Sequence, residues 1–136
     1  MLLVMDAGNT NIVFGIYDNE TLLHHWRMQT DRSATEDEYA MTFKQLLAHV
    51  ELHFSQITGA IISSVVPPIT YVLRKLSEKY LMINPLILGP GVKTGLHIQT
   101  DDPREVGADR IANAVAAVEL YGAPAIIVDF GTATTF

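Results

Sequence analysis

The stretch VMDAGNTNIVFG, residues 4–15, decides the fold of this chain. An apolar run stops at Asp6, passes through a glycine and small polar residues, and then becomes apolar again. This pattern is typical of two strands joined by a short turn. The turn is unusual because it carries two asparagines and a threonine after the aspartate. We expect antiparallel strands at 2–6 and 11–18, and a third strand at 21–30 that continues the meander.

The rest of the chain alternates between helical and strand patterns. After Thr35 the apolar residues recur at helical spacing, and Thr35 with Glu38 forms a capping box. Short runs rich in β-branched residues predict buried strands between the helices. The predicted elements are a helix from Thr35, a strand at 59–66, a helix from Pro67, a strand at 85–89, a helix that starts at 101–103 and ends at Gly122, and a strand at 125–129. This order predicts the α/β class, with a mixed sheet in which an antiparallel three-strand meander is followed by alternating helices and strands.

The composition is that of a globular protein and argues against several kinds of partner. Hydrophobic residues make up 49% and charged residues 18% of the 136 residues, unlike a disordered chain. The net charge of −6 argues against nucleic acid or an anionic membrane as a partner. The absence of cysteine excludes disulfides and thiolate chemistry. No stretch has the pattern of a membrane span or a signal peptide, so we expect a cytoplasmic protein.

The opening motif has a second copy near the end of the chain. LLVMDAGNTN (2–11) and AIIVDFGTAT (125–134) each contain four apolar residues, an aspartate, one further residue, a glycine, and then threonine among small polar residues. A glycine-containing turn exposes backbone N–H groups that can bind phosphate oxygens. An aspartate beside a phosphate is repelled unless a cation lies between them, so the pair indicates a metal-bridged nucleotide. For either loop alone, an ordinary β-turn remains the alternative.

The segment VGADR, residues 106–110, is the candidate for acceptor chemistry. Asp109 and Arg110 fall in the first half of a predicted helix, and Gly107 inside that helix would cost up to about 1 kcal/mol relative to alanine. Phosphorylation of an alcohol requires a group that orients the hydroxyl and accepts its proton, and Asp109 can do both. Arg110 can bind a carboxylate or phosphate, or hold Asp109 in place. An exposed Asp-Arg pair without function is the alternative.

Three segments together resemble one known family. DAGNTNIVFG (6–15), DPREVGADRIANA (102–114) and DFGTATT (129–135) are similar to type III pantothenate kinases, within the actin, Hsp70 and sugar-kinase superfold. The resemblance implies a ribonuclease H-like (actin-like ATPase) domain at 1–122, and the first strand and phosphate loop of a truncated second domain at 123–136. In the family the chain continues through that second domain, so we expect this chain to be its N-terminal half. Asp102 departs from the asparagine that the family often has there.

The resemblance also assigns roles. It implies ATP-dependent phosphorylation of pantothenate to 4'-phosphopantothenate, the first step of coenzyme A biosynthesis. Asp109 would be the catalytic proton acceptor, and Asp129 would help to bind a monovalent cation, potassium or ammonium. Magnesium would accompany ATP, and the active form would be a homodimer. The implied pantothenate contacts are Gly107, Ala108, Asp109 and Arg110. The implied ATP contacts are Asp6, Ala7, Gly8, Asn9, Thr10, Asn11, Ile12, Val13 and Thr132.

Two alternatives remain at this stage. One is another kinase of the superfold, such as a sugar or acetate kinase. The other is a nucleotide-gated accessory regulator without catalytic activity. A substrate screen distinguishes the first, and nucleotide binding without a phosphorylated product would indicate the second.

Overall fold

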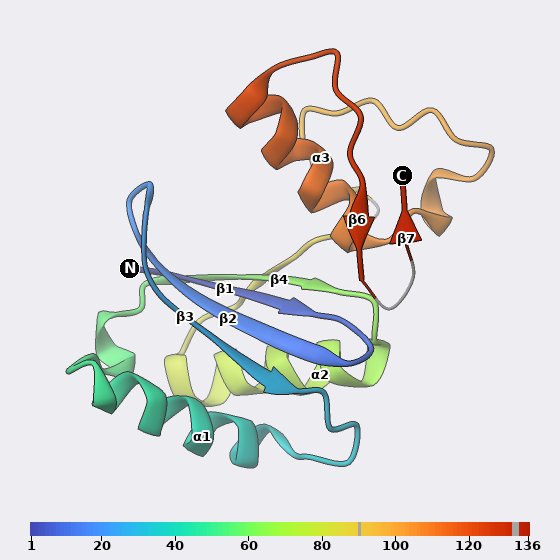
Figure 1. Cartoon of the computed structure of the whole chain (residues 1–136). Helices are drawn as coiled ribbons and strands as arrows, with labels where there is room; N and C mark the ends of the chain where they lie inside the picture. The colour runs from blue at the N-terminus through green and yellow to red at the C-terminus, as the bar shows by residue number, and fades with distance from the viewer. Residues whose placement is uncertain (90, 132–133) are drawn as a thin grey trace.

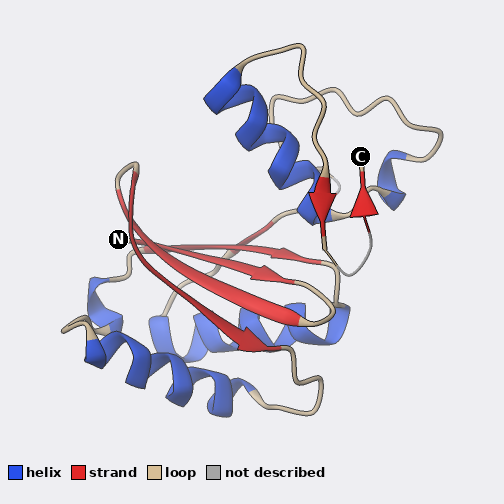
Figure 2. Ribbon diagram, viewed as in Figure 1, coloured by secondary structure: helices blue, strands red, loops and turns tan. Residues whose placement is uncertain are grey.

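A computed structural model of the chain describes residues 1–89, 91–131 and 134–136. Its main feature is a five-stranded sheet with the strand order β3-β2-β1-β4-β5 (Figures 1 and 2). The strands are β1 (Leu2–Ala7), β2 (Asn11–Asp18), β3 (Thr21–Gln29), β4 (Gly59–Ser64) and β5 (Leu86–Ile87). The predicted α/β class and mixed sheet are therefore confirmed.

The first three strands form the predicted meander. β1 pairs antiparallel with β2, and β2 pairs antiparallel with β3. On its other side β1 pairs in parallel with β4, and this register places Asp6 beside Ser63. β5 is shorter than the predicted strand at 85–89, since Pro85 has no N–H to donate to the ladder and the pairing with β4 covers only Leu86 and Ile87.

Two helices cover one face of the sheet. α1 (Glu36–His49) and α2 (Pro67–Leu76) lie side by side beneath it in Figure 1, and a π-helical turn, Ser77–Leu81, extends α2. The predicted capping box is confirmed, since the Glu38 N–H donates to the Thr35 hydroxyl and the Glu38 carboxylate accepts from the Thr35 N–H. Proline occupies the first turn of α2, as predicted.

The hydrophobic core lies between this face and the two helices. Phe14 of β2 and Phe43 of α1 stack with ring centroids 4.9 Å apart. Trp26 of β3 and Phe54 also contact Phe43, each with a centroid separation of 6.0 Å. Alternate strand residues point into this core because successive side chains of a strand face opposite ways. The fully buried members include Leu3, Met5, Ile12, Phe14, Ile16, Phe43, Leu47, Ile62, Ile69, Leu73 and Leu76.

The third helix begins later than its pattern predicts. Residues Pro103–Glu105 form one 3-10 turn, in which the Asp102 carboxylate accepts from the Arg104 N–H at 2.9 Å. α3 runs from Ala108 to Tyr121 with Gly107 as its N-cap. The expectation that Gly107 lies inside a helix is wrong, because this residue is extended and carries no helix-interior cost.

The C-terminal part of the described chain forms a separate small sheet. β6 (Asp129–Phe130) pairs antiparallel with β7 (Thr134–Thr135). The predicted strand at 125–129 is therefore wrong over most of its length. Ile126 is 90% exposed and has no strand beside it, and an apolar segment needs a paired neighbour to become a sheet strand.

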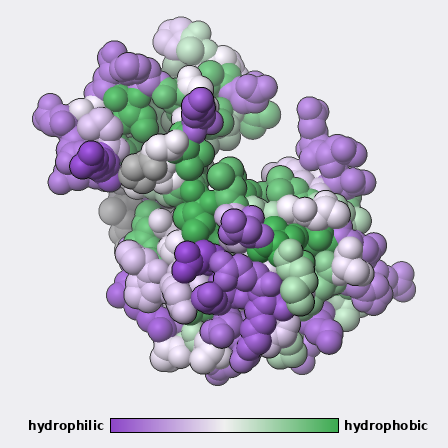
Figure 3. Space-filling model, turned by 180° about the vertical axis from the view of Figure 1, so that it is seen from behind, coloured by the Kyte–Doolittle hydropathy of each residue, from purple (hydrophilic) through white to green (hydrophobic). Residues whose placement is uncertain are grey.

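Apolar side chains also reach the surface. Seen from behind in Figure 3, they gather where the segment that carries α3 meets the sheet. No helix within residues 1–89, 91–131 and 134–136 is long and apolar enough to cross a membrane.

Candidate functional site

The loop between β1 and β2 is a tight, anchored turn. The Gly8 N–H donates to the Asn11 carbonyl at 2.9 Å, which closes the turn. Asp6 lies near the end of β1 with its side chain exposed, whereas Ala7 is buried. The sheet therefore holds the backbone on both sides of the turn while the Asp6 carboxyl stays accessible to a ligand.

The chain after β3 braces this loop. The Thr30 N–H donates to the Thr10 carbonyl at 2.9 Å, and the Thr30 hydroxyl donates to the Gly8 carbonyl at 2.8 Å. The Arg32 guanidinium donates to the Asn9 side-chain oxygen at 2.9 Å. These contacts place the positively charged Arg32 side chain at the edge of the loop. They also restrain the backbone of the loop.

The start of α3 forms the second part of the site. The Asp109 carboxylate is half-buried and accepts from the Arg110 N–H at 2.8 Å, while the Arg110 side chain is exposed. Ala108 and Ile111 are buried and anchor the first turn of the helix. Asp109 thus stands on a fixed helix end, where the helix dipole favours negative charge.

Gly107 leaves room for the Asp109 carboxylate. A Cβ atom built on Gly107 would collide with Asp109 Oδ1 and lie 3.4 Å from Val65 Cγ1. We expect Gly107→Ala to displace this carboxylate and, because Asp109 is the predicted proton acceptor, to reduce turnover by about 100-fold, the effect typical of misplacing a reacting group by about 1 Å. Steady-state kinetics of the full protein that carries this chain measure the effect.

Gly59→Ala is the matched control for Gly107→Ala. A Cβ atom there would also meet a methyl group at 3.4 Å, that of Leu2, but no carboxylate. Gly59 opens β4, at the opposite end of that strand from Ser64. Equal turnover in the two variants would refute the steric explanation.

The Asp6 carboxylate lies within electrostatic range of two other carboxylates at this end of the sheet. The pKa of Asp6 is raised from its ordinary value of 3.8, chiefly because the protein atoms around its carboxyl desolvate the charged form, even though the residue keeps solvent-accessible surface. A hydrogen bond from Ser63 opposes the shift, and the negative charges of Asp109 and Asp129 add to it. The structure therefore brings both predicted loop aspartates and the predicted proton acceptor within electrostatic range.

This arrangement suits a cation that retains other ligands. Magnesium binds through one or two carboxylates together with waters and substrate phosphates. Within the described part of the chain, no three or more acidic or histidine side chains form a group that could hold a metal ion. A magnesium ion brought by a nucleotide fits Asp6, because the ion would reduce the repulsion that raises the pKa of this group.

The other predicted ATP contacts occupy the strands on both sides of the turn. The side chains of Ile12 and Ala7 are buried, with 0% and 1% exposure. Only the backbone of these two residues could therefore contact a ligand. Asn9 and Thr10 are exposed in the turn, and Val13 is half-buried. Thr132 lies outside the described residues.

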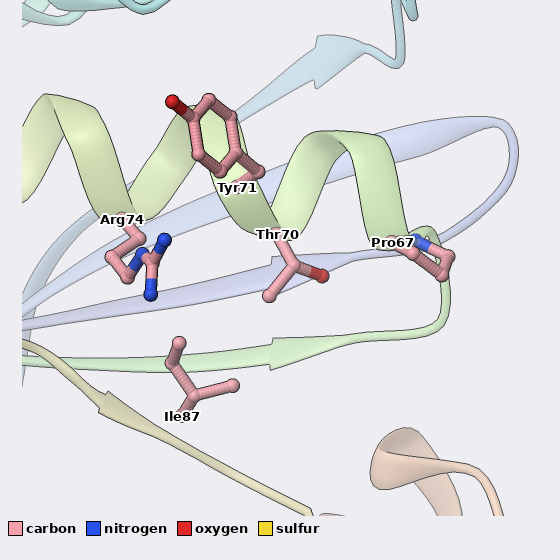
Figure 4. Close-up of a pocket in the computed structure, with 5 residues that line it drawn as sticks. All are labelled: Pro67, Thr70, Tyr71, Arg74 and Ile87. Atoms are coloured by element: carbon pink, nitrogen blue, oxygen red, sulfur yellow. The ribbon is translucent and has the colours of Figure 1, made fainter.

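Two cavities lie apart from these residues. The larger, of about 300 Å³, is formed by Pro67, Thr70, Tyr71 and Arg74 of α2 with Ile87 of β5 (Figure 4). It contains no carboxylate, and its Arg74 guanidinium stacks 5.5 Å from the centre of the Tyr71 ring. A smaller cavity of about 160 Å³ lies between the loop before α3 and Ile111. Neither cavity includes a predicted site residue.

Three further residues contact the site without a clear sequence signal. Thr30 and Arg32 follow the end of β3, where their TDR pattern carries no recognised signal. Ser63 lies in an apolar strand and donates to Asp6 Oδ1 at 2.9 Å. The available sequence signal for Ser63 is a hydroxyl side chain within 59–66, a segment whose other residues are mostly apolar and typical of a buried strand.

The fold and the site define an α/β protein with an acidic, glycine-containing loop at one end of a mixed sheet. The family model for type III pantothenate kinase matches residues 2–136. Relatives named type III pantothenate kinase include those of Geobacillus sp. (strain WCH70), 64% identical, and Halalkalibacterium halodurans, 61% identical. The alignments cover 100% of this chain, and 53% and 54% of these relatives respectively. The chain belongs to the type III pantothenate kinase family, and it spans about half the length of the curated relatives it matches.

Proposed function

We propose that the chain is part of a kinase that transfers the γ-phosphoryl group of ATP to pantothenate, giving 4'-phosphopantothenate for coenzyme A synthesis. Family membership supports this activity, because the relatives that cover the whole chain are named for it. The observation that carries the proposal is the convergence of Asp6, Asp109 and Asp129 at one end of the sheet. Phosphoryl transfer requires both a cation-bearing nucleotide and a proton acceptor there.

We also propose the ribonuclease H-like, actin-like ATPase fold for residues 1–122. The strand order β3-β2-β1-β4-β5, with a meander followed by parallel strands, is compatible with that fold. Residues 123–136 would begin a second domain. The pairing of β6 with β7, apart from the main sheet, supports this division.

In this mechanism each part of the site has one task. The turn after Asp6 would hold the triphosphate through its backbone, and Asp6 would hold the magnesium ion, which when bound would supply charge neutralisation of the phosphates. Asp109 accepts the proton of the primary hydroxyl of pantothenate and aligns its oxygen for attack. Arg110, exposed beside it, binds the pantothenate carboxylate or a phosphate oxygen. Asp129 helps to hold potassium or ammonium.

We further propose a cytoplasmic homodimer that binds neither nucleic acid nor membrane. The net charge of −6 supports the exclusion of polyanionic partners. The test of the whole proposal is a coupled assay of the full protein with pantothenate, ATP, magnesium and potassium. A screen of sugars and acetate in the same assay separates this kinase from others of the superfold.

Asp6→Asn should change stability and binding in opposite directions. The folded protein raises the pKa of this carboxyl above 3.8, so stability falls as pH rises from 3.8 through the raised value, and stays lower at neutral pH. We expect the variant to have a higher unfolding midpoint than the parent at neutral pH without nucleotide, and no advantage below pH 3.8. It should bind magnesium-ATP more weakly. Thermal unfolding and calorimetry measure the two effects.

Asp129→Asn should likewise weaken the dependence of activity on the metal ions and the nucleotide. Asp18→Asn, at the exposed far end of β2, is the control for both variants. If the Asp6 and Asp129 variants respond to magnesium and potassium as the parent does, the cation assignment is wrong.

A further inference from the structure

Two buried serine hydroxyls donate their hydrogen bonds to different kinds of acceptor. Within the described ranges the buried polar residues are Ser63 and Ser77. The Ser77 hydroxyl donates to the Leu73 carbonyl at 2.9 Å, a local bond along its own helix. The Ser63 hydroxyl donates instead to Asp6 Oδ1 at 2.9 Å, across 57 positions of sequence. Ser63 therefore links two strands through their side chains.

The register of the sheet makes this link specific. β4 runs parallel to β1 with Ser63 beside Asp6, so the two side chains leave the same face. Beyond this pair the Val65 N–H donates to the Ala7 carbonyl at 3.1 Å, which holds the ends of the strands together. Ser63 thus has a fixed backbone from which to hold the neighbouring carboxylate.

The hydrogen bond from Ser63 orients the Asp6 carboxylate and uses one of its two oxygens. A carboxylate has two oxygens, and with Oδ1 engaged by Ser63, Oδ2 remains to meet a ligand. The negative charges of Asp109 and Asp129 repel this carboxylate. Without the hydroxyl, the side chain would gain rotamer freedom and turn away from them.

We propose that Ser63 is a positioning residue, whose hydroxyl orients the Asp6 carboxylate toward the magnesium of bound magnesium-ATP. The inference rests on the proposed function and adds a residue of β4 to the nucleotide side of the site. In this role Ser63 acts through its hydrogen bond to Asp6 and needs no contact with the acceptor hydroxyl or the transferred phosphoryl group. Its loss therefore affects magnesium dependence and the KM for ATP more than the KM for pantothenate.

The experiment uses the full protein that carries this chain. Ser63→Ala should raise the magnesium concentration for half-maximal activity and the Kd for magnesium-ATP by about tenfold, the low end of the range for a hydrogen bond to a charged group. Isothermal calorimetry without pantothenate measures the Kd, so the test does not depend on turnover. Ser63→Thr keeps the hydroxyl in a residue that suits strands and should restore both values.

Ser77→Ala is the matched control, because it also removes a buried, hydrogen-bonded hydroxyl. It should lower the unfolding midpoint and leave the magnesium dependence unchanged. A Ser63→Ala protein that loses stability but keeps the parent's magnesium dependence would overturn the positioning role alone. A parent protein that binds no magnesium-ATP would overturn the proposed function and this inference with it.

Discussion

Asp109→Asn is expected to reduce phosphorylation of pantothenate by about 10²- to 10⁴-fold, the usual contribution of a positioned general base. Asparagine has nearly the same shape and its oxygen can still accept from the Arg110 N–H, as Asp109 Oδ1 does at 2.8 Å. It cannot accept a proton at neutral pH. The fall should therefore appear in kcat, while the Kd for magnesium-ATP stays near that of the parent.

The control for this variant lies on the same helix. Glu119 is an exposed carboxylate in the last turns of α3, and Glu119→Gln removes the same charge far from the helix start. Parallel measurement of kcat, nucleotide Kd and thermal unfolding separates loss of the base from loss of fold. Turnover of Asp109→Asn close to the parent value would show that another group accepts the proton.

Phe43→Ala should produce the largest loss of stability. Phe43 is fully buried and its ring contacts Phe14, Trp26 and Phe54, so it joins α1 to two strands and to the turn after the helix. Removing a buried phenylalanine ring typically costs about 3–5 kcal/mol, from lost transfer free energy and the cavity that remains. Urea unfolding of the full protein, followed in the transition that involves α1, measures the loss.

Met41→Ala is the matched control for Phe43→Ala. Met41 belongs to the same helix but is 41% exposed. Substitutions at such surface positions usually change the free energy of unfolding by no more than about 0.5 kcal/mol. Similar losses in the two variants would mean that this aromatic cluster is not the centre of the core.

The residues behind these two predictions belong to different parts of the structure, since Phe43 packs against the covered face of the sheet and Asp109 lies in the first turn of α3. Phe14 and Phe43 stabilise the face that α1 and α2 cover, whereas Asp6 and Ser63 lie near the ends of β1 and β4, where Asp6 is within electrostatic range of Asp109 of α3. A site whose carboxylates repel one another reduces stability, and the packed face offsets that cost. The structure thus separates the residues that support the fold from those assigned to chemistry.

The sequence by itself determined the features that depend on near neighbours. The meander, the capping box at Thr35 and the proline start of α2 follow from turn residues, alternation and helix caps within a few positions of one another. The motif at Asp6 and the GADR segment at 107–110 were also visible, because their residue types and spacing are local. Resemblance to a family, rather than spacing, assigned the roles of their residues.

Only the tertiary structure decided which distant residues meet. The parallel register of β1 and β4 sets Ser63 against Asp6, and the path after β3 brings Arg32 to Asn9. Local patterns also misplaced the start of α3 and the strand at 125–129. The physical reason is that strand pairing and side-chain contacts are made between segments far apart in the chain, and their energies do not appear in the preferences of either segment alone.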